Sequence, residues 1–344
     1  MEELKTVKDV EDFRVGEDRL FCSATHEEIV SGATSDLYFI RTRELLKQAG
    51  REIVPVVAEI FTTQPGLLCG IEEAVRLLRG KNISLWTLPE GAEIQSKEVV
   101  MRIGGPYDEF AMYETALLGI LASSSGWASA SRECKSAAGE KPVFCFGARH
   151  LHPAVAPVME RAAIIGGADN CSCILGAKLL GREPSGTVPH AAVLIMGDTV
   201  RTALLYDQIM PASSPRIILV DTFKDEAEET IRVAEALGEK LDGVRLDTPG
   251  ERGGVTPGLV REIRARLDLQ GFPKVKILVS GGVTPERIKI LSDAGADAFG
   301  VGSYISSAPP LDMTMDIKEI EGRPLAKRGR IPGITPNPAL VRRF

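Results

Sequence analysis

The chain has 344 residues, 44% hydrophobic and 26% charged, and its 41 basic and 47 acidic side chains give a formal net charge of −6. This composition is typical of a globular enzyme, excludes a disordered or fibrous chain, and argues against nucleic acid as a partner. Apolar runs stay far below the roughly 20 residues of a membrane span, and the six cysteines form no C-x-x-C pair of the zinc-binding kind. Scattered thiols without a signal-peptide pattern predict a cytoplasmic protein with no protein-held metal site.

The N-terminal part of the chain predicts an α+β domain over residues 1–118. Residues 35–50 place apolar side chains at helical spacing and end in a glycine, which suits a helix C-cap. Residues 53–63 predict a strand, 70–81 an amphipathic helix, and 83–103 hairpin-like strands.

The pattern changes at Glu114, where a long helical region rich in small residues begins. Strand-like apolar runs then alternate with helical patterns; they cover residues 143–147, 190–196, 216–222, 241–247, 274–282 and 297–303. This alternation predicts a parallel sheet covered on both faces. Six such units predict an α/β fold with a complete or nearly complete parallel barrel over 119–306. The proline- and glycine-rich tail, 307–344, is expected to pack back on the first domain.

Polar residues or glycine pairs follow almost every predicted strand, where barrel enzymes place their active sites. They are Arg149, His150 and His152, then Asp221, then Arg245 and Asp247, then Gly281 and Gly282, and finally Gly302 and Ser303. Packing of the core does not by itself explain why polar groups and glycines recur at the ends of so many strands. The glycine pairs leave backbone N–H groups open ahead of a helix, which predicts a phosphate site.

Several of these residues allow more than one interpretation. Asp221 and Asp247 suit general bases, metal ligands or ribose anchors, and Asp221 also suits a helix N-cap. Arg149 and Arg245 suit bidentate binding of phosphate or carboxylate, or surface ion pairs. His190, in GTVPHAAVLIMGD, is either a catalytic or phosphate-accepting group or a satisfied histidine at a strand edge.

The ordered motifs SDLYFIRT, ETALLGIL, FCFGARHLHP, GTVPHA, LVDT, VRLD, VSGG and GVGS resemble the nicotinate phosphoribosyltransferase family, a group of type II phosphoribosyltransferases. The resemblance implies that nicotinate and 5-phosphoribosyl 1-pyrophosphate (PRPP) are joined into nicotinate mononucleotide and pyrophosphate, in NAD biosynthesis. It also implies Mg²⁺ bound mainly through the substrate diphosphate, and ATP as co-substrate through a phosphohistidine at His190. The related quinolinate phosphoribosyltransferase, which decarboxylates its substrate, is one alternative, although GARHLHP replaces its Arg–Lys cluster. The other alternative is a different phosphate-binding barrel enzyme.

The resemblance also assigns roles to individual residues. Tyr38 and Phe146 would sandwich the pyridine ring, with Tyr38 supplied by the neighbouring subunit, and Arg149 would bind the ring carboxylate. Asp221 and Asp247 would hold the ribose hydroxyls, Arg245 the diphosphate, and Thr187 would contact substrate. The 5′-phosphate would lie against Gly281, Gly282, Gly302 and Ser303. A homodimer, or a larger ring of dimers, with shared active sites is therefore expected.

Overall fold

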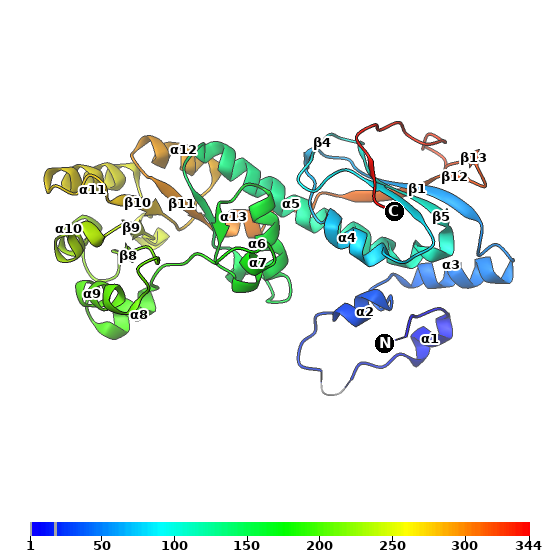
Figure 1. The fold of residues 1–344 in the computed structure, drawn as a ribbon, viewed down its shortest axis with the longest axis horizontal. Coiled ribbons are helices and arrows are strands. Elements are labelled where there is room, and N and C mark those ends of the chain that lie inside the picture. The colour runs from blue at the N-terminus through cyan, green and yellow to red at the C-terminus, as the bar shows by residue number, and fades with distance from the viewer. Residues whose placement is uncertain (1, 17–18) are drawn as a thin grey trace. The chain divides into compact units, whose positions relative to one another are not determined.

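The structure is a computed structural model that describes residues 2–16 and 19–344, and it divides into two compact units (Figure 1). The N-terminal unit contains the residues up to Ser129 together with Pro309–Phe344, and the parallel-sheet unit contains Ala130–Ala308. The division falls inside helix α5 (Glu114–Ala138), later than the predicted boundary at residue 118. No proline interrupts this helix, so no break in the sequence marks where one unit ends.

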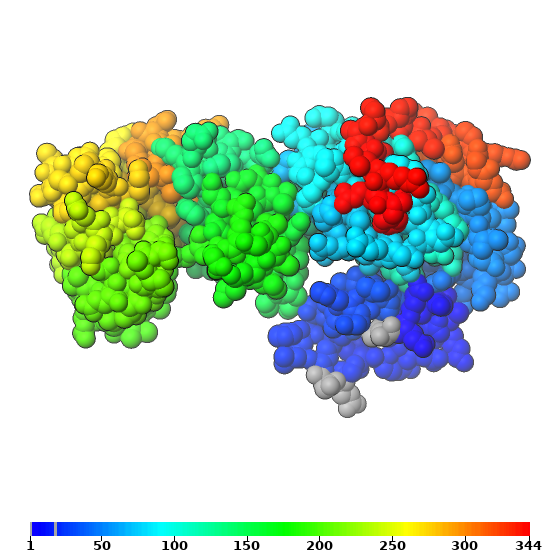
Figure 2. Space-filling view, viewed as in Figure 1, coloured from blue at the N-terminus to red at the C-terminus, as the bar shows by residue number. Residues whose placement is uncertain are grey.

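The N-terminal unit is built on a six-stranded antiparallel sheet of order β13-β12-β1-β5-β3-β14. Its strands are β1 (Pro55–Thr62), β3 (Ser84–Thr87), β5 (Val99–Pro106), β12 (Met313–Ile320), β13 (Arg323–Pro324) and β14 (Val341–Arg342). The tail thus contributes three strands to this sheet, and Figure 2 shows the last residues, in red, lying on the cyan N-terminal segment. Two shorter strands, β2 (Gly66–Leu67) and β4 (Glu93–Ile94), form a separate antiparallel pair.

Short helices complete this unit: α1 (Val7–Asp12), α2 (His26–Val30), α3 (Leu37–Gln48), α4 (Ile71–Leu78), η1 (Tyr107–Glu109) and η2 (Ala111–Tyr113). Helix α4 buries Ile71, Ala74, Val75 and Leu78, the face that its apolar spacing predicts. Helix α3 is followed by Gly50, whose φ of +64° only glycine adopts at little cost. The helices predicted over 35–50 and 70–81, and the strand over 53–63, are confirmed.

The second unit contains a six-stranded parallel sheet of order β7-β6-β11-β10-β9-β8. The strands are β6 (Val143–Cys145), β7 (Asn170–Cys171), β8 (Ile217–Leu219), β9 (Gly243–Leu246), β10 (Lys276–Val279) and β11 (Ala298–Val301). The α-helices that follow them are α6 (Ala156–Ile165), α7 (Ile174–Lys178), α8 (His190–Met196), α9 (Thr199–Ile209), α10 (Glu226–Leu237), α11 (Pro257–Leu269), α12 (Pro285–Asp293) and α13 (Ser303–Ser306). The 3₁₀ turns are η3 (Ala148–His150), η4 (Gly238–Lys240) and η5 (Gly250–Arg252). This alternation confirms the α/β class.

The prediction of a closed or nearly closed barrel is wrong, because the sheet is a half-barrel with β7 and β8 at its edges. Residues 190–196, predicted as a buried strand, form helix α8 between an extended Pro189 and Gly197 at φ +79°. Ile195 is 85% exposed, which a strand covered on both faces would not allow. A short apolar run has no periodicity that distinguishes the two structures. Within residues 2–16 and 19–344, no helix is long and apolar enough to cross a membrane.

Candidate active site

A cavity of about 390 Å³ lies where strands of the parallel sheet end. Its lining comes from loops that are distant in sequence, namely Phe146, Ala148, Arg149, His150, Ser172, Gly186, Thr187, Arg245, Asp247, Ser280, Gly281, Gly282, Gly300, Gly302 and Ser303. The carboxyl ends of parallel strands meet at one edge of a sheet, which is where open α/β sheets bind ligands. Nine of the twelve site residues selected from the sequence line this cavity.

Arg245, on β9, organises one side of the cavity. Its guanidinium donates hydrogen bonds to the Ser280 hydroxyl, the Thr187 hydroxyl and an Asp247 carboxylate oxygen, each at 2.9 Å. The Ser280 hydroxyl in turn donates to the other Asp247 oxygen at 2.8 Å. The ends of β9 and β10 and the loop before α8 are thereby held in one polar network, and charge-assisted bonds of this kind keep a specific geometry.

The aromatic side of the cavity depends on glycine. A Cβ at Gly300 would lie 2.5 Å from Cε2 of Phe146, so the ring packs directly on the backbone of β11. The guanidinium carbon of Arg245 lies 5.4 Å from the centre of the same ring, a cation–π arrangement. Phe146 therefore presents a fixed aromatic wall beside the polar network.

Glycines also open the loops after β10 and β11. Gly281 has φ +84°, and a Cβ there would lie 3.2 Å from the Asp247 carboxylate. A Cβ at Gly302 would lie 3.1 Å from Nε2 of His150. Both positions let backbone N–H groups approach a ligand that side chains would displace.

His190 and Asp221 lie together but do not line this cavity. Nε2 of His190 is 3.2 Å from Asp221, whose side chain is only 1% exposed. Neither Asp221 oxygen accepts a well-aligned hydrogen bond. Burial raises the pKa of Asp221 above its ordinary value, and His190 opposes that rise. The pair is a buried carboxylate next to an imidazole that is 38% exposed.

Tyr38 is not among the residues that line this cavity. It belongs to the N-terminal unit, in α3, and is 55% exposed. Lys178, the last residue of α7, forms an ion pair with Glu183 in the loop that follows.

Sequence reasoning missed several residues that line the cavity or hold its loops. Ser280 stands in the quoted VSGG motif, so its place at a strand end could have been noticed. Ser172 follows β7, a two-residue strand without a recognisable apolar run. Glu160, inside α6, accepts hydrogen bonds from Ala148 and Ser172, and nothing in the sequence pattern distinguished it.

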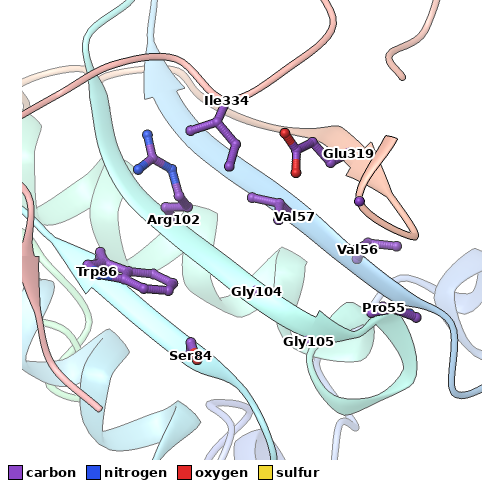
Figure 3. A pocket seen from close by; sticks show the side chains of 11 residues that line it. Pro55, Val56, Val57, Ser84, Trp86, Arg102, Gly104, Gly105, Glu319 and Ile334 are labelled. Carbon is purple, nitrogen blue, oxygen red and sulfur yellow. The ribbon is translucent and has the colours of Figure 1, made fainter. Parts of the chain in front are cut away.

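A second cavity, of about 460 Å³, lies on the sheet of the N-terminal unit beside Trp86 and Arg102 (Figure 3). Arg102 is held by Glu59 at 2.8 Å and also donates to the Thr335 carbonyl. None of the residues selected from the sequence lines this cavity. The Arg102 guanidinium therefore joins the sheet to the C-terminal tail.

This chain matches two family models and several curated proteins. The model of the quinolinate phosphoribosyl transferase N-terminal domain matches residues 36–125, and that of its C-terminal domain matches 127–316. The chain is 31% identical over 263 residues to nicotinate phosphoribosyltransferase pncB2 of Mycobacterium tuberculosis, a match covering 73% of this chain and 55% of that protein. The chain thus spans about half the length of the curated relatives it matches first.

Solved structures agree with these matches. The chain is similar to nicotinate-nucleotide pyrophosphorylase from Pyrococcus furiosus, with a TM-score of 0.88 and 45% identity over 92% of this chain and 82% of that one. Human nicotinic acid phosphoribosyltransferase shares the fold, with a TM-score of 0.68 and 19% identity over 87% of this chain and 77% of that one. The family resemblance of the sequence motifs is thereby confirmed. The chain belongs to the type II phosphoribosyltransferase family.

Proposed function

We propose that this protein transfers the phosphoribosyl group of PRPP to the ring nitrogen of a pyridine carboxylate, giving nicotinate mononucleotide and pyrophosphate. The observation that carries the proposal is the cavity at the strand ends. It combines the Phe146 ring and the Arg149 guanidinium with the Asp247 carboxylate, the Ser280 hydroxyl and the open glycine loops after β10 and β11. A flat anionic ring and a phosphorylated sugar require these two kinds of surface.

The pyridine would bind at the side formed by Phe146 and Arg149. The Phe146 ring is held by Gly300 and can stack on a flat ring. Arg149 is exposed and makes no hydrogen bond or ion pair with any residue in the described part of the chain, so its fork is available to a carboxylate. Arg245, by contrast, is already bound to Asp247 and two hydroxyls.

The phosphoribosyl group would bind at the opposite side. Asp247 and Ser280 face ribose hydroxyls, and backbone N–H groups of Gly281, Gly282, Gly302 and Ser303 surround the 5′-phosphate. The Arg245 guanidinium has two N–H donors beyond the three already used, and these would contact the diphosphate. Asp221, which is outside the cavity lining, would support the ribose from behind it. Asp247 is held by two hydrogen bonds, which limits its motion before substrate arrives.

Magnesium would be held mainly by the substrate diphosphate. Among residues 2–16 and 19–344 there is no group of three or more histidine, cysteine or acidic side chains that could form a protein cage. The two buried Asp221 oxygens accept no well-aligned hydrogen bond, so they could accept from the waters of a hydrated magnesium ion. When bound, the ion neutralises charge on the leaving diphosphate.

Little covalent chemistry is required of the protein. The ring nitrogen attacks the anomeric carbon, the bond from that carbon to the diphosphate oxygen breaks, and pyrophosphate leaves with the electron pair. Arg245 and the backbone N–H groups stabilise the departing charge, while Phe146 holds the ring for attack. With quinolinate as substrate, the C2–carboxylate bond also breaks, CO₂ leaves, and C2 takes a proton.

The two candidate pyridines have different support. Quinolinate is supported by both family models and by the 45% identical structure, which is named for pyrophosphorolysis of nicotinate nucleotide. Nicotinate, the main expectation from the sequence, is supported by the 31% identical curated relative and by Arg149, which of the two arginines lining the cavity is the one without a partner among the described residues. The comparisons as a whole lie closer to quinolinate, and nicotinate stays a prediction.

ATP as a co-substrate also stays a prediction and rests on His190. Asp221 faces Nε2, which would orient the imidazole and leave Nδ1 to attack the γ-phosphoryl group. The P–O bond to ADP would break as the N–P bond forms, and water would later hydrolyse the phosphohistidine. An imidazole that is 38% exposed is accessible for this step.

The test is product formation with Mg²⁺ and PRPP, using nicotinate, quinolinate or nicotinamide separately, with and without ATP. Nicotinate mononucleotide from either acid would support the transferase, and release of CO₂ would identify quinolinate. An ATP stimulation that disappears in His190→Ala would support the phosphohistidine. Absence of product from all three pyridines would refute the proposed function.

A further inference from the structure

Glu160 is a fully buried carboxylate that joins two loops of the cavity without lining it. It lies within α6, and its Oε1 accepts hydrogen bonds from the Ala148 N–H at 3.1 Å and the Ser172 hydroxyl at 3.0 Å. Its Oε2 accepts from the Cys173 N–H. One carboxylate therefore binds the chain just after β6 and just after β7.

These three donors fix a carboxylate that would otherwise be costly to bury. A charged group away from water must be fully hydrogen-bonded, and all three bonds of Glu160 come from the two loops. Close packing keeps the helices that carry these groups in place. A Cβ at Gly176, in α7, would lie 3.2 Å from Cβ of Glu160, so any larger residue there would push α7 and α6 apart by a few tenths of an ångström.

The loops held by Glu160 contribute one side of the cavity only. Ala148, Arg149 and His150 follow β6, and Ser172 follows β7, and all four line the cavity. The opposite side, with Asp247 and the glycine pair at Gly281, has its own network through Arg245 and Ser280. Among the described residues, Glu160 makes no hydrogen bond with Arg245, Asp247 or Ser280, so it acts on the site through the loops after β6 and β7.

We propose that Glu160 is a positioning residue that sets the pyridine side of the cavity by holding the loops after β6 and β7. The inference rests on the proposed function, because the Arg149 side is where the pyridine carboxylate is proposed to bind. Glutamine at this position keeps the size of the side chain. Its amide NH₂ turns a donor toward backbone N–H groups that need an acceptor, so at least one loop amide is released.

The test compares Glu160→Gln with wild type in KM for each substrate and in amide hydrogen exchange without substrate. We expect KM for the pyridine carboxylate to rise about tenfold, KM for PRPP to change less than about twofold, and at least one of the Ala148 and Cys173 amides to exchange faster. Glu160→Asp retains both acceptor oxygens and should give an intermediate KM for the pyridine, which also covers the case in which the glutamine variant does not fold.

Glu229→Gln is the matched control, since Glu229 is an equally buried glutamate of α10 in the same unit, paired with Arg232 and outside the cavity. It should leave both KM values unchanged. An equal rise in the two KM values of Glu160→Gln, or unchanged exchange at both loop amides, would overturn the positioning role. Inactivity of the wild type with every pyridine would refute the proposed function instead, and the exchange measurement would still decide the role of Glu160.

Discussion

Replacing Gly300 by alanine tests whether Phe146 forms the wall of the pyridine site. The new Cβ would lie 2.5 Å from Cε2 and 2.6 Å from Cδ2 of the ring. Carbon atoms in ordinary contact are about 3.5–4.0 Å apart, so one group must move by about 1 Å. Gly300 lies in β11, paired with Phe144 of β6 on one side, and its backbone is not free to retreat.

The ring must therefore move into the cavity. Overpacking of this size costs about 1–3 kcal/mol in a packed interior. Part of that strain is relieved by occupying the 390 Å³ that the substrate is proposed to use. If these roughly 1–3 kcal/mol are lost from the free energy of pyridine binding, KM for the pyridine should rise by about 5- to 150-fold, with a smaller change in KM for PRPP.

Steady-state kinetics with each substrate varied in turn measures this split, and thermal unfolding measures stability in parallel. Gly119→Ala is the control, because Gly119 lies exposed in α5 with no atom within 4 Å of its Cβ position. That change should stabilise the protein by about 0.5–1 kcal/mol and leave both KM values unchanged. A Gly300→Ala variant with wild-type KM for the pyridine would refute the assignment of Phe146.

Three further changes test other parts of the structure. Burial raises the pKa of Glu114 from 4.5 to about 7, so the fold favours the protonated form, and the free energy of unfolding should fall as pH rises from about 4.5 to 7. In urea titrations at pH 5 and 8, Glu114→Gln should lack this loss of about 1–3 kcal/mol. Parallel pH profiles of the two proteins would contradict the prediction. Asp247→Asn removes the charged partner of Arg245 at 2.9 Å and should cost about 1–3 kcal/mol in urea unfolding while raising KM for PRPP; an unchanged KM would exclude Asp247 from the ribose site. Mixed oligomers of inactive Tyr38→Ala and Arg149→Ala chains should regain about a quarter of wild-type activity if subunits share sites, and none if each chain forms its own.

Much of the fold and the site follows from local sequence patterns. Periodicity located helices α3 and α4, because burial of one face imposes a repeat on the chain. The strand-end residues also followed from the sequence, since a motif that ends an apolar strand must lie at the edge of a parallel sheet. For this reason nine of the selected residues line one cavity, although the strands that carry them are far apart in the chain.

Other features depended on contacts between distant segments. The run HAAVLIM forms helix α8, with Leu194 and Ile195 exposed, although its sequence is compatible with either a helix or a strand. Strand β7 is two residues long and exists through its pairing with β6. Without a strand from 190–196 the sheet stays open, so the number of strand-like runs did not determine the barrel.

The sequence by itself determined the family, the α/β class and the polar groups available at the strand ends. Only the tertiary structure decided which of those groups meet: Arg245 with Asp247 and Ser280, His190 with Asp221, and Glu160 with the loops after β6 and β7. The physical reason is that the local sequence pattern indicates only which face of a helix or strand is buried. A residue's hydrogen-bond partners come from segments tens of residues away, and those are set only when the strands pair and the helices pack.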